Sequence, residues 1–257
     1  KERMKRLIMS GDYQILAMIH DKIDMGEFAK QMTGRLLDYA QRNNWLGRQI
    51  LDLGCGTGES ISWLTQHGYI VSGIDESAEM LTIARQNLQQ RNVNAQLVQG
   101  DFRANSNFSD QDMVLAINVL NEVNNIRELE QVFKHTHAIL RAGKWMVFDF
   151  YTIEGLYQRN QAAYNIVHNS DNLTIFTGNR LDYEKSIQTR DYMIFQQEED
   201  RWQRYQAQRT LRAYPIQGVV ALLKRAGFNV EHVLNLNMTE YNSNQPTDRV
   251  IIFAEKE

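Results

Sequence analysis

The sequence predicts an α/β fold with a doubly wound, largely parallel sheet, and three observations support that class. Short apolar runs alternate with helical patterns between residues 45 and 151, which is typical of strands joined by crossover helices. The first run ends in closely spaced glycines. After residue 151 polar and bulky residues alternate, which is typical of antiparallel strands. We expect one domain over 1–257, with an N-terminal helical cap at 1–44 and an antiparallel β insertion after the fifth strand at 152–213.

Composition limits the classes of partner. Of 257 residues, 43% are hydrophobic and 23% are charged, which suits a globular chain with a full core. A formal net charge of −3 gives no overall electrostatic signal for nucleic acid and leaves only a local basic patch open, and no apolar run has the length of a membrane span. Cys55 is the only cysteine, so no intrachain disulfide can form, and we expect a cytoplasmic protein. With no histidine or acidic neighbour in sequence, Cys55 is better explained as a small buried thiol than as a nucleophile.

Two helices are predicted over residues 12–43, where they would cap the sheet. Apolar residues recur there at helical spacing. The faces consist of Ile15, Met18, Ile19 and Lys22 or Ile23 in the first helix, and of Phe28, Met32, Leu36 and Tyr39 in the second.

The stretch Gln49–Gly58 combines the first strand with a loop that contains Gly54, Gly56 and Gly58. Glycine adopts positive φ and has no Cβ, so a ligand can lie against bare backbone and the start of the next helix. Three spaced glycines favour a binding loop over an ordinary turn. Asp52, at the end of the strand, is placed to meet a polar or cationic part of that ligand.

The other elements follow from periodicity and from terminal signals. We expect helices at Glu59–Gln66, after an N-cap at Ser77, at Arg127–Leu140 with Gly143 as its stop, and from Pro215 to Ala226, and strands at Tyr69–Ile74, Ala95–Gln99, Met113–Ile117, Trp145–Phe150, Phe228–Leu236 and Arg249–Ala254. Three antiparallel strands are expected between Leu173 and Leu211, with turns near 183–186 and 198–201.

Polar residues follow the strands at the edge where such sheets bind ligands. They are Asp52, Gly54, Asp75, Asp101, Asn118 and Tyr151. Asp75 lies about 20 residues past the glycine loop, where a βαβ unit places an acceptor for ribose hydroxyls. A dinucleotide fingerprint would need glycine at Glu59, and a carboxylate there is unfavourable for a pyrophosphate but acceptable for a ligand with a cationic centre.

These residues resemble the motifs of class I S-adenosylmethionine-dependent methyltransferases, whose fold is a Rossmann-like sheet. Residues 50–58 match the first motif of that family, 73–81 the second and 100–102 the third, and 112–122 and 140–143 also fit. The family usually has Pro-Gly-Gly where this chain has Ala142-Gly143-Lys144, a departure at a turn. The resemblance covers roughly residues 45–151 and 214–254.

The resemblance implies S-adenosylmethionine as methyl donor and S-adenosylhomocysteine as product. The implied cofactor contacts are Asp52 with Gly54, Cys55 and Gly56 at the methionine part, Asn118 beside it, Asp75 at the ribose, and Asp101, Phe102 and Met80 around the adenine. Glu76 is a further expected cofactor contact. Plain core packing explains Phe102 and Met80 equally well.

Catalytic residues are harder to read, because a sulfonium methyl is already activated and alignment supplies most of the rate. A base is needed only when the nucleophile arrives protonated. The candidates are His20, Tyr13, Asn121 and Glu122, with Tyr13, Asn121 and Tyr151 as substrate contacts. A surface or capping role remains open for His20, and a helix N-terminal charge for Glu122. His135 and His137 point to different helix faces, so no metal site is expected.

The insertion resembles the lid of enzymes that methylate amines or hydroxyls of small molecules, including amino-sugar and glycine N-methyltransferases. Its arginines and aromatic residues fit either a pocket for an aromatic or anionic substrate or a sheet with arginine on its solvated side. We expect methyl transfer to a small-molecule amine or hydroxyl. The alternatives are a nucleic-acid or protein methyltransferase with the same core, and a non-catalytic cofactor-binding subunit. Residues 118–121 lack the Asn-Pro-Pro-Tyr or Asp-Pro-Pro-Tyr pattern of base methylation.

Overall fold

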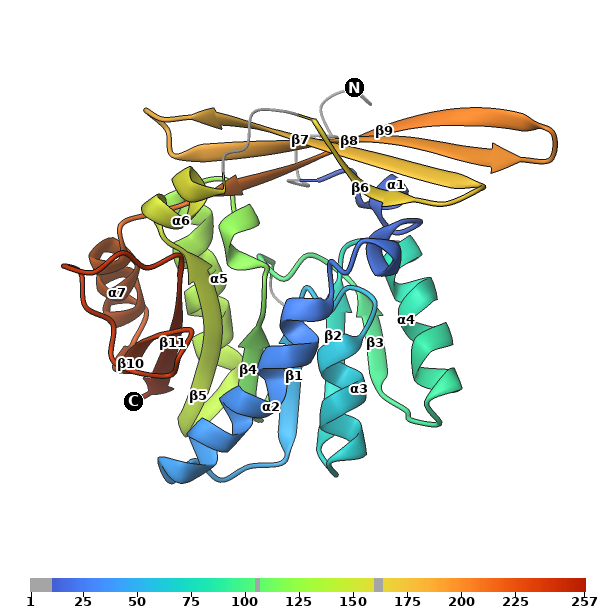
Figure 1. Cartoon of the computed structure of the whole chain (residues 1–257). Helices are drawn as coiled ribbons and strands as arrows, with labels where there is room; N and C mark the ends of the chain where they lie inside the picture. The colour runs from blue at the N-terminus through green and yellow to red at the C-terminus, as the bar shows by residue number, and fades with distance from the viewer. Residues whose placement is uncertain (1–10, 105–106, 160–163) are drawn as a thin grey trace, which may run out of the picture.

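The computed structural model describes residues 11–104, 107–159 and 164–257 (Figure 1). Its helices are α1 (Tyr13–Leu16), η2 (His20–Lys22), α2 (Glu27–Arg42), α3 (Glu59–Gln66), α4 (Ala78–Gln90), η3 (Leu120–Glu122), α5 (Ile126–Ile139), α6 (Ile153–Gln158) and α7 (Ile216–Arg225). Its strands are β1 (Gln49–Leu53), β2 (Ile70–Asp75), β3 (Gln96–Gln99), β4 (Gln111–Ala116), β5 (Leu140–Tyr151), β6 (Asn165–Asn169), β7 (Leu173–Asp182), β8 (Ile187–Glu198), β9 (Arg201–Arg212), β10 (Phe228–Asn235) and β11 (Arg249–Lys256). Within the described part of the chain, no helix is long and apolar enough to cross a membrane.

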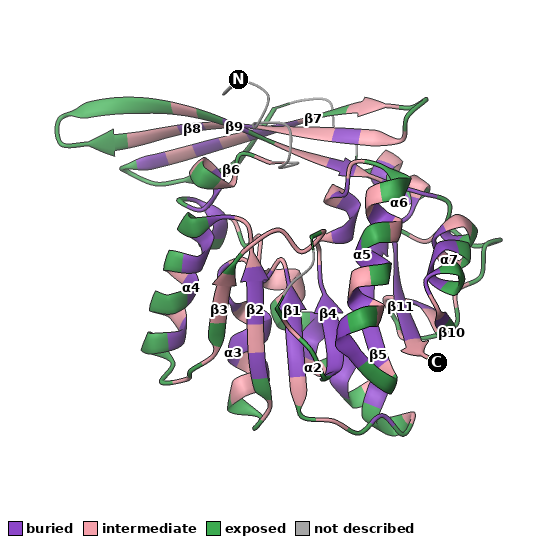
Figure 2. Ribbon diagram, turned by 180° about the vertical axis from the view of Figure 1, so that it is seen from behind, coloured by how far each residue is buried: buried purple, intermediate pink, exposed green. Residues whose placement is uncertain are grey.

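Seven strands form the main sheet in the order β10-β11-β5-β4-β1-β2-β3. The strands β1 to β5 pair in parallel, and β11 runs antiparallel to both of its neighbours. Alternate residues of β4 face opposite sides: Val114 packs toward α5 and α7, and Leu115 packs toward α2, α3 and α4. Helices therefore cover both faces, and the sheet is buried between them (Figure 2). The predicted Rossmann-like α/β class is confirmed.

The insertion forms a second, antiparallel sheet in the order β6-β7-β8-β9, which lies over the carboxyl ends of the main-sheet strands (Figure 1). The three predicted strands are present as β7, β8 and β9, with turns at 183–186 and 199–200. The strand β6 was not predicted, because its residues are mostly exposed and form no alternating pattern.

The first predicted helix had the wrong end, and the helix predicted over Arg127–Leu140 does not have Gly143 as its stop. The first helix is a single turn, α1, followed by η2, and Asp24 has a φ of 53° before α2 begins. The chain turns there instead of continuing the apolar face, and Met18 is 42% exposed. At the other position, α5 ends at Ile139 and not near Gly143, because Leu140 is extended and pairs with Gln111. Gly143, with a φ of 69°, lies where residues 141–144 bulge out of the ladder with β4.

Candidate active site

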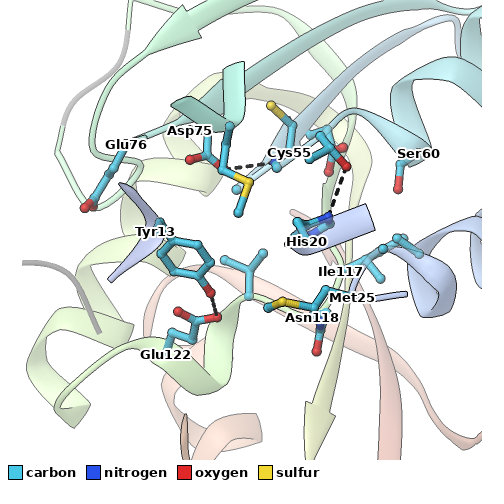
Figure 3. A pocket seen from close by; sticks show the side chains of 18 of the residues that line it. Tyr13, His20, Met25, Cys55, Ser60, Asp75, Glu76, Ile117, Asn118 and Glu122 are labelled. Carbon is cyan, nitrogen blue, oxygen red and sulfur yellow. Dashed lines mark hydrogen bonds between the residues drawn. The ribbon is translucent and has the colours of Figure 1, made fainter. Parts of the chain in front are cut away.

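A pocket lies at the carboxyl ends of β1, β2 and β4, where the polar strand ends were predicted to converge. It encloses about 960 Å³ of empty space, including its open mouth. Its wall contains Asp52, Gly54, Cys55, Gly56, Asp75, Glu76, Met80, Phe102, Asn118, Glu122, Tyr13 and His20 among the predicted site residues. Figure 3 shows Tyr13 and His20 reaching the pocket from the N-terminal segment, and Asp75 and Glu76 reaching it from the end of β2.

The backbone of the loop after β1 has a conformation that requires glycine at three positions. Gly54, Gly56 and Gly58 have φ values of 62°, 51° and 85°, which side chains rarely adopt. A Cβ on Gly54 would lie 2.6 Å from Val119 Cγ2, so the loop packs too closely there for any side chain. At Gly56 the space is open except for His20 Nε2, 3.8 Å from the Cβ position. The loop thus presents bare backbone to the pocket.

Two carboxyl groups lie behind this loop. Asp52 is 3% exposed, and burial, followed by the charge of Asp75, raises its pKa to about 8. Asp75 accepts hydrogen bonds from the Gly56 N–H and the Ser77 N–H, both at 2.9 Å. Burial raises the pKa of Asp75 as well, and these two N–H groups oppose that rise. A cation bound beside these two acids would favour their ionised forms.

An arginine that the sequence analysis did not single out organises the far end of the pocket. Arg103 binds both Glu76 and Asp101, the latter at 2.7 Å from Nε. Burial raises the pKa of Glu76 to about 7, and Asp101 adds to that rise while Arg103 opposes it. Asp101 lies outside the pocket wall, whereas Phe102 and Arg103 line it. Met80 is also in the wall, but its side chain is 1% exposed and packs in an apolar cluster with α1 and the insertion.

Glu59 lines the pocket, and its carboxylate is paired with an arginine. The charge of this residue was the reason to exclude a dinucleotide as ligand. Arg91 holds its carboxylate through two hydrogen bonds of 2.8 and 3.0 Å. Arg91 neutralises part of the charge of Glu59, so this carboxylate is a weaker reason against a pyrophosphate ligand. The expectation of a cationic ligand therefore depends on the buried carboxyl groups of Asp52 and Asp75.

His20 is buried at the start of η2 and is oriented by two partners. Its Nδ1 lies 2.8 Å from Asp21 Oδ1 and 3.2 Å from Thr57 Oγ1. Since a carboxylate only accepts, Nδ1 carries the proton, and Nε2 is left as an acceptor toward Gly56. The hydrogen bond from His20 is the largest cause that lowers the pKa of Asp21, to about 2.

Tyr13 and Glu122 meet Arg209 of β9 above the pocket. The Tyr13 hydroxyl donates to Glu122, and Arg209 Nε donates to the same carboxylate at 2.7 Å. Burial is the largest cause that raises the pKa of Tyr13. The N-terminal segment also joins β9 through main chain, since the Asp12 N–H donates to Gln208 O at 2.8 Å. The N-terminal segment and the insertion together close the top of the pocket.

Asn121 and Tyr151 were predicted substrate contacts, but they lie outside the pocket wall. Asn121 is 4% exposed, and its amide bonds the Tyr151 N–H at 2.7 Å and Arg212 O at 2.9 Å. It ties the end of β5 to β9. The Tyr151 ring lies 3.7 Å from the guanidinium of Arg249, which pairs with buried Asp149.

Asn118 does line the pocket and has a φ of 63°. The carboxylate of Asp149 accepts from its N–H, and Arg249 Nη2 donates to its Oδ1 at 3.2 Å. No local sequence signal predicts this support, because Asp149 and Arg249 come from separate strands. Among the residues that the structure describes, no cluster of histidine, cysteine and acidic side chains could hold a metal ion.

We compared the sequence and the structure with those of known proteins. Residues 50–143 match the family model described as a methyltransferase domain. The chain is 24% identical over 210 residues, 81% of this chain and 85% of the other, to a protein of Geobacillus sp. (strain WCH70) that is provisionally named a methyltransferase. Residues 50–143 therefore carry a methyltransferase domain, and the chain as a whole has the fold of S-adenosylmethionine-dependent methyltransferases.

Two solved structures share almost the whole fold. One is an S-adenosylmethionine-dependent methyltransferase from Clostridium acetobutylicum ATCC 824, with a TM-score of 0.80, 19% identity and coverage of 95% of this chain and 98% of that one. The other is the sugar N-methyltransferase KedS8 from Streptoalloteichus sp. ATCC 53650, with a TM-score of 0.73, 17% identity and coverage of 93% of both chains. At these identities the likeness concerns the fold, including the insertion.

The pocket fits the cofactor of this class. S-adenosylmethionine carries an ammonium and a sulfonium, and Asp52 and Asp75 are buried carboxyl groups that a cation would stabilise in their ionised form. The bare backbone at Gly56 leaves room beside them.

Proposed function

We propose that this enzyme methylates an amine or a hydroxyl of a small molecule by in-line displacement. The observation that carries the proposal is the closed top of the pocket, where Tyr13, Glu122 and Arg209 join three separate elements. An enclosed site of this kind suits a small acceptor better than a duplex or a folded protein surface. The shared fold with a sugar N-methyltransferase supports the same reading.

The cofactor contacts follow from the wall of the pocket. We assign Asp52 and the backbone of Gly54 to Gly56 to the ammonium and methionine part, with Asn118 beside them, and Asp75 to the ribose. Glu76, Phe102 and Met80 would surround the adenine. Asp101 would help there indirectly, because Arg103 links it to Glu76. When bound, S-adenosylmethionine supplies a methyl group activated by its sulfonium.

Among the titratable groups at the top of the pocket, His20 is best prepared to accept a proton. Its Nδ1–H is held by Asp21, so the lone pair of Nε2 faces the pocket. Tyr13 retains its proton because its pKa is raised, and Glu122 is engaged by Arg209. We therefore assign proton removal from the acceptor to His20, and positioning of the acceptor to Tyr13 and Glu122.

Labelled methyl transfer tests the proposal. The purified protein and S-adenosylmethionine with a radioactive methyl group are incubated with separate small-molecule, nucleic-acid and protein fractions of a cell extract. We expect label in the small-molecule fraction. Label in nucleic acid or protein would instead identify a macromolecular methyltransferase. Binding of S-adenosylhomocysteine without label in any fraction would indicate a non-catalytic subunit.

A further inference from the structure

The inner face of the insertion sheet carries a row of polar side chains across three strands. Arg190 of β8 is directly opposite Arg209 of β9 and Asn179 of β7. Residues in register on neighbouring strands share a face of the sheet. Arg209 reaches Glu122 and the pocket, so Arg190 and Asn179 also face the interior of the protein.

This row separates two apolar contacts. On one side the inner face packs against α1 and Met80 through Ile175, Tyr192, Ile194 and Ala207. On the other side Leu211 packs against Tyr151 and Leu156. Between these two apolar contacts the inner face carries two cations, Arg190 and Arg209. An inward arginine needs a compensating partner, because removing its charge from water is unfavourable.

Two arginines in this region have no acidic partner within residues 11–104, 107–159 and 164–257. Arg190 Nε donates to Asn179 Oδ1 at 2.9 Å, and the Arg159 guanidinium lies 4.9 Å from the centre of the Tyr151 ring. Asn179 Nδ2 also donates to Arg159 O at 3.0 Å, so the two arginines belong to one region. Among the residues that the structure describes, no carboxylate lies within ion-pair distance of either guanidinium.

The electrostatic surroundings of Arg159 agree with this geometry. Burial lowers the pKa of Arg159, and the charges of Arg190, Arg249 and Arg209 lower it further, against an opposing contribution from Tyr151. The outer face of the same sheet behaves differently. There Arg180 pairs with Asp191 at 2.9 Å in solvent. Within the part of the chain that the structure describes, Arg190 is therefore the unpaired cation of the inner face, and Arg159 is an exposed residue beside it.

We propose that Arg190 and Arg159 bind an anionic group, a carboxylate or a phosphate, on the methyl acceptor. Guanidinium groups bind such anions through paired hydrogen bonds, and arginine retains its charge when partly buried. Arg190 is one strand spacing, about 4.8 Å, from Arg209 in the pocket wall. A small acceptor held by its anionic end at Arg190 would reach past Glu122 toward the methyl donor. This inference rests on the proposed function and specifies its substrate class.

Anion binding can be measured without turnover. The protein is saturated with S-adenosylhomocysteine and titrated calorimetrically with inorganic phosphate and, separately, with acetate. We expect saturable binding of one of the two, and the better probe distinguishes a phosphate ester from a carboxylate. Arg190→Gln and Arg159→Gln should each weaken that binding at least about tenfold. The matched control Arg180→Gln, on the outer face, should bind as the wild type does.

Stability distinguishes a binding role from a structural one. Arg190→Gln removes an unpaired cation, so its unfolding midpoint in urea should equal or exceed that of the wild type while anion binding falls. Arg190→Lys, which keeps the charge, should retain more binding than Arg190→Gln. The inference is overturned if neither anion binds saturably, if Arg190→Gln binds normally, if Arg180→Gln weakens binding equally, or if Arg190→Gln loses stability together with binding.

The two proposals fail in different ways. Label in nucleic acid or protein would reject small-molecule methylation whatever the anion titration shows. Label in small molecules with no saturable binding of phosphate or acetate would reject the anion site alone.

Discussion

Asp52 and Asp75 end neighbouring parallel strands, and the charge of Asp75 adds to burial in raising the pKa of Asp52 to about 8. The charge of Asp75 therefore opposes ionisation of Asp52. A cation between them reverses that effect, because an opposite charge favours the ionised form. Methyl-donor binding and proton release are thereby coupled at one pair of residues.

The first prediction concerns the pH dependence of S-adenosylhomocysteine binding. Below about pH 8 Asp52 is mostly protonated in the free protein, and the ammonium of the ligand requires its carboxylate. Affinity should therefore rise between about pH 6 and pH 8, by at most about tenfold per pH unit. Calorimetry in two buffers of different ionisation enthalpy measures the released proton directly. Constant affinity over this range would remove Asp52 from the ammonium site.

Asp52 should also impose a pH dependence on folding. Because its folded pKa is raised, its favourable contribution is complete below about pH 4 and is lost as pH rises through about 8. Asp52→Asn should equal the wild type in stability at pH 4 and exceed it at pH 9, although it binds the cofactor more weakly. Urea unfolding at both pH values provides the test. A variant that is less stable at pH 9 would contradict the assignment.

Asp75 has a different expected effect, because it binds backbone as well as ligand. Asp75→Ala should weaken S-adenosylhomocysteine binding about 10- to 100-fold, through loss of the ribose contact and of the acceptor for the Gly56 N–H. The protein should remain folded by circular dichroism. The surface variant Asp38→Ala, on α2, is the matched control and should bind normally. Unchanged affinity in Asp75→Ala would show that the ribose lies elsewhere.

Much of this site follows from local signals in the sequence. The glycine loop, Asp75 and the N-cap at Ser77 each depend on residues close together in the chain, and the structure has them where they were expected; Ser77 accepts from the Met80 N–H at 3.1 Å. The same holds for the buried strands, whose apolar runs give their position directly. Parallel pairing then brings their carboxyl ends together without further information.

Other parts depend on contacts between distant segments, and the sequence does not reveal those. Arg209 reaches Glu122 only because β9 folds back over the pocket, and Asn121 is occupied by Tyr151 and Arg212 for the same reason. The brevity of α1 has a related cause, because tertiary packing outweighs helical periodicity in a short segment. Sequence patterns predicted Tyr13 and Glu122 as residues of the site, but they did not predict the contacts of these residues with each other and with Arg209.

Asp149 and Arg249 form a buried ion pair beneath the site. We predict that removing one partner lowers the free energy of unfolding more than removing both charges does. The two residues are 1% and 3% exposed, and their charged atoms lie 2.9 Å apart. Arg249 also stacks between Phe28 and Tyr151, with its guanidinium 3.8 and 3.7 Å from the ring centres. Arg249→Met should lower the free energy of unfolding by about 3–5 kcal/mol, because Asp149 is left buried and unpaired.

The double variant Asp149→Asn with Arg249→Met keeps an acceptor for the Asn118 N–H and removes both charges. It should therefore recover a large part of the lost stability in urea unfolding. Equal loss in the single and double variants would mean that packing, and not the unpaired charge, is responsible.

The last prediction tests the base. His20→Ala should lower kcat by about 10²- to 10⁴-fold, the usual contribution of a positioned general base, with little change in S-adenosylhomocysteine affinity. Asp21→Asn should lower kcat less, because the ring remains but its Nδ1 loses the carboxylate that orients it. Both variants are compared with His67→Ala, on the exposed end of α3. A kcat in His20→Ala equal to that of His67→Ala would exclude His20 as the base. The acceptor would then arrive already deprotonated, because Tyr13 retains its proton and Arg209 engages Glu122.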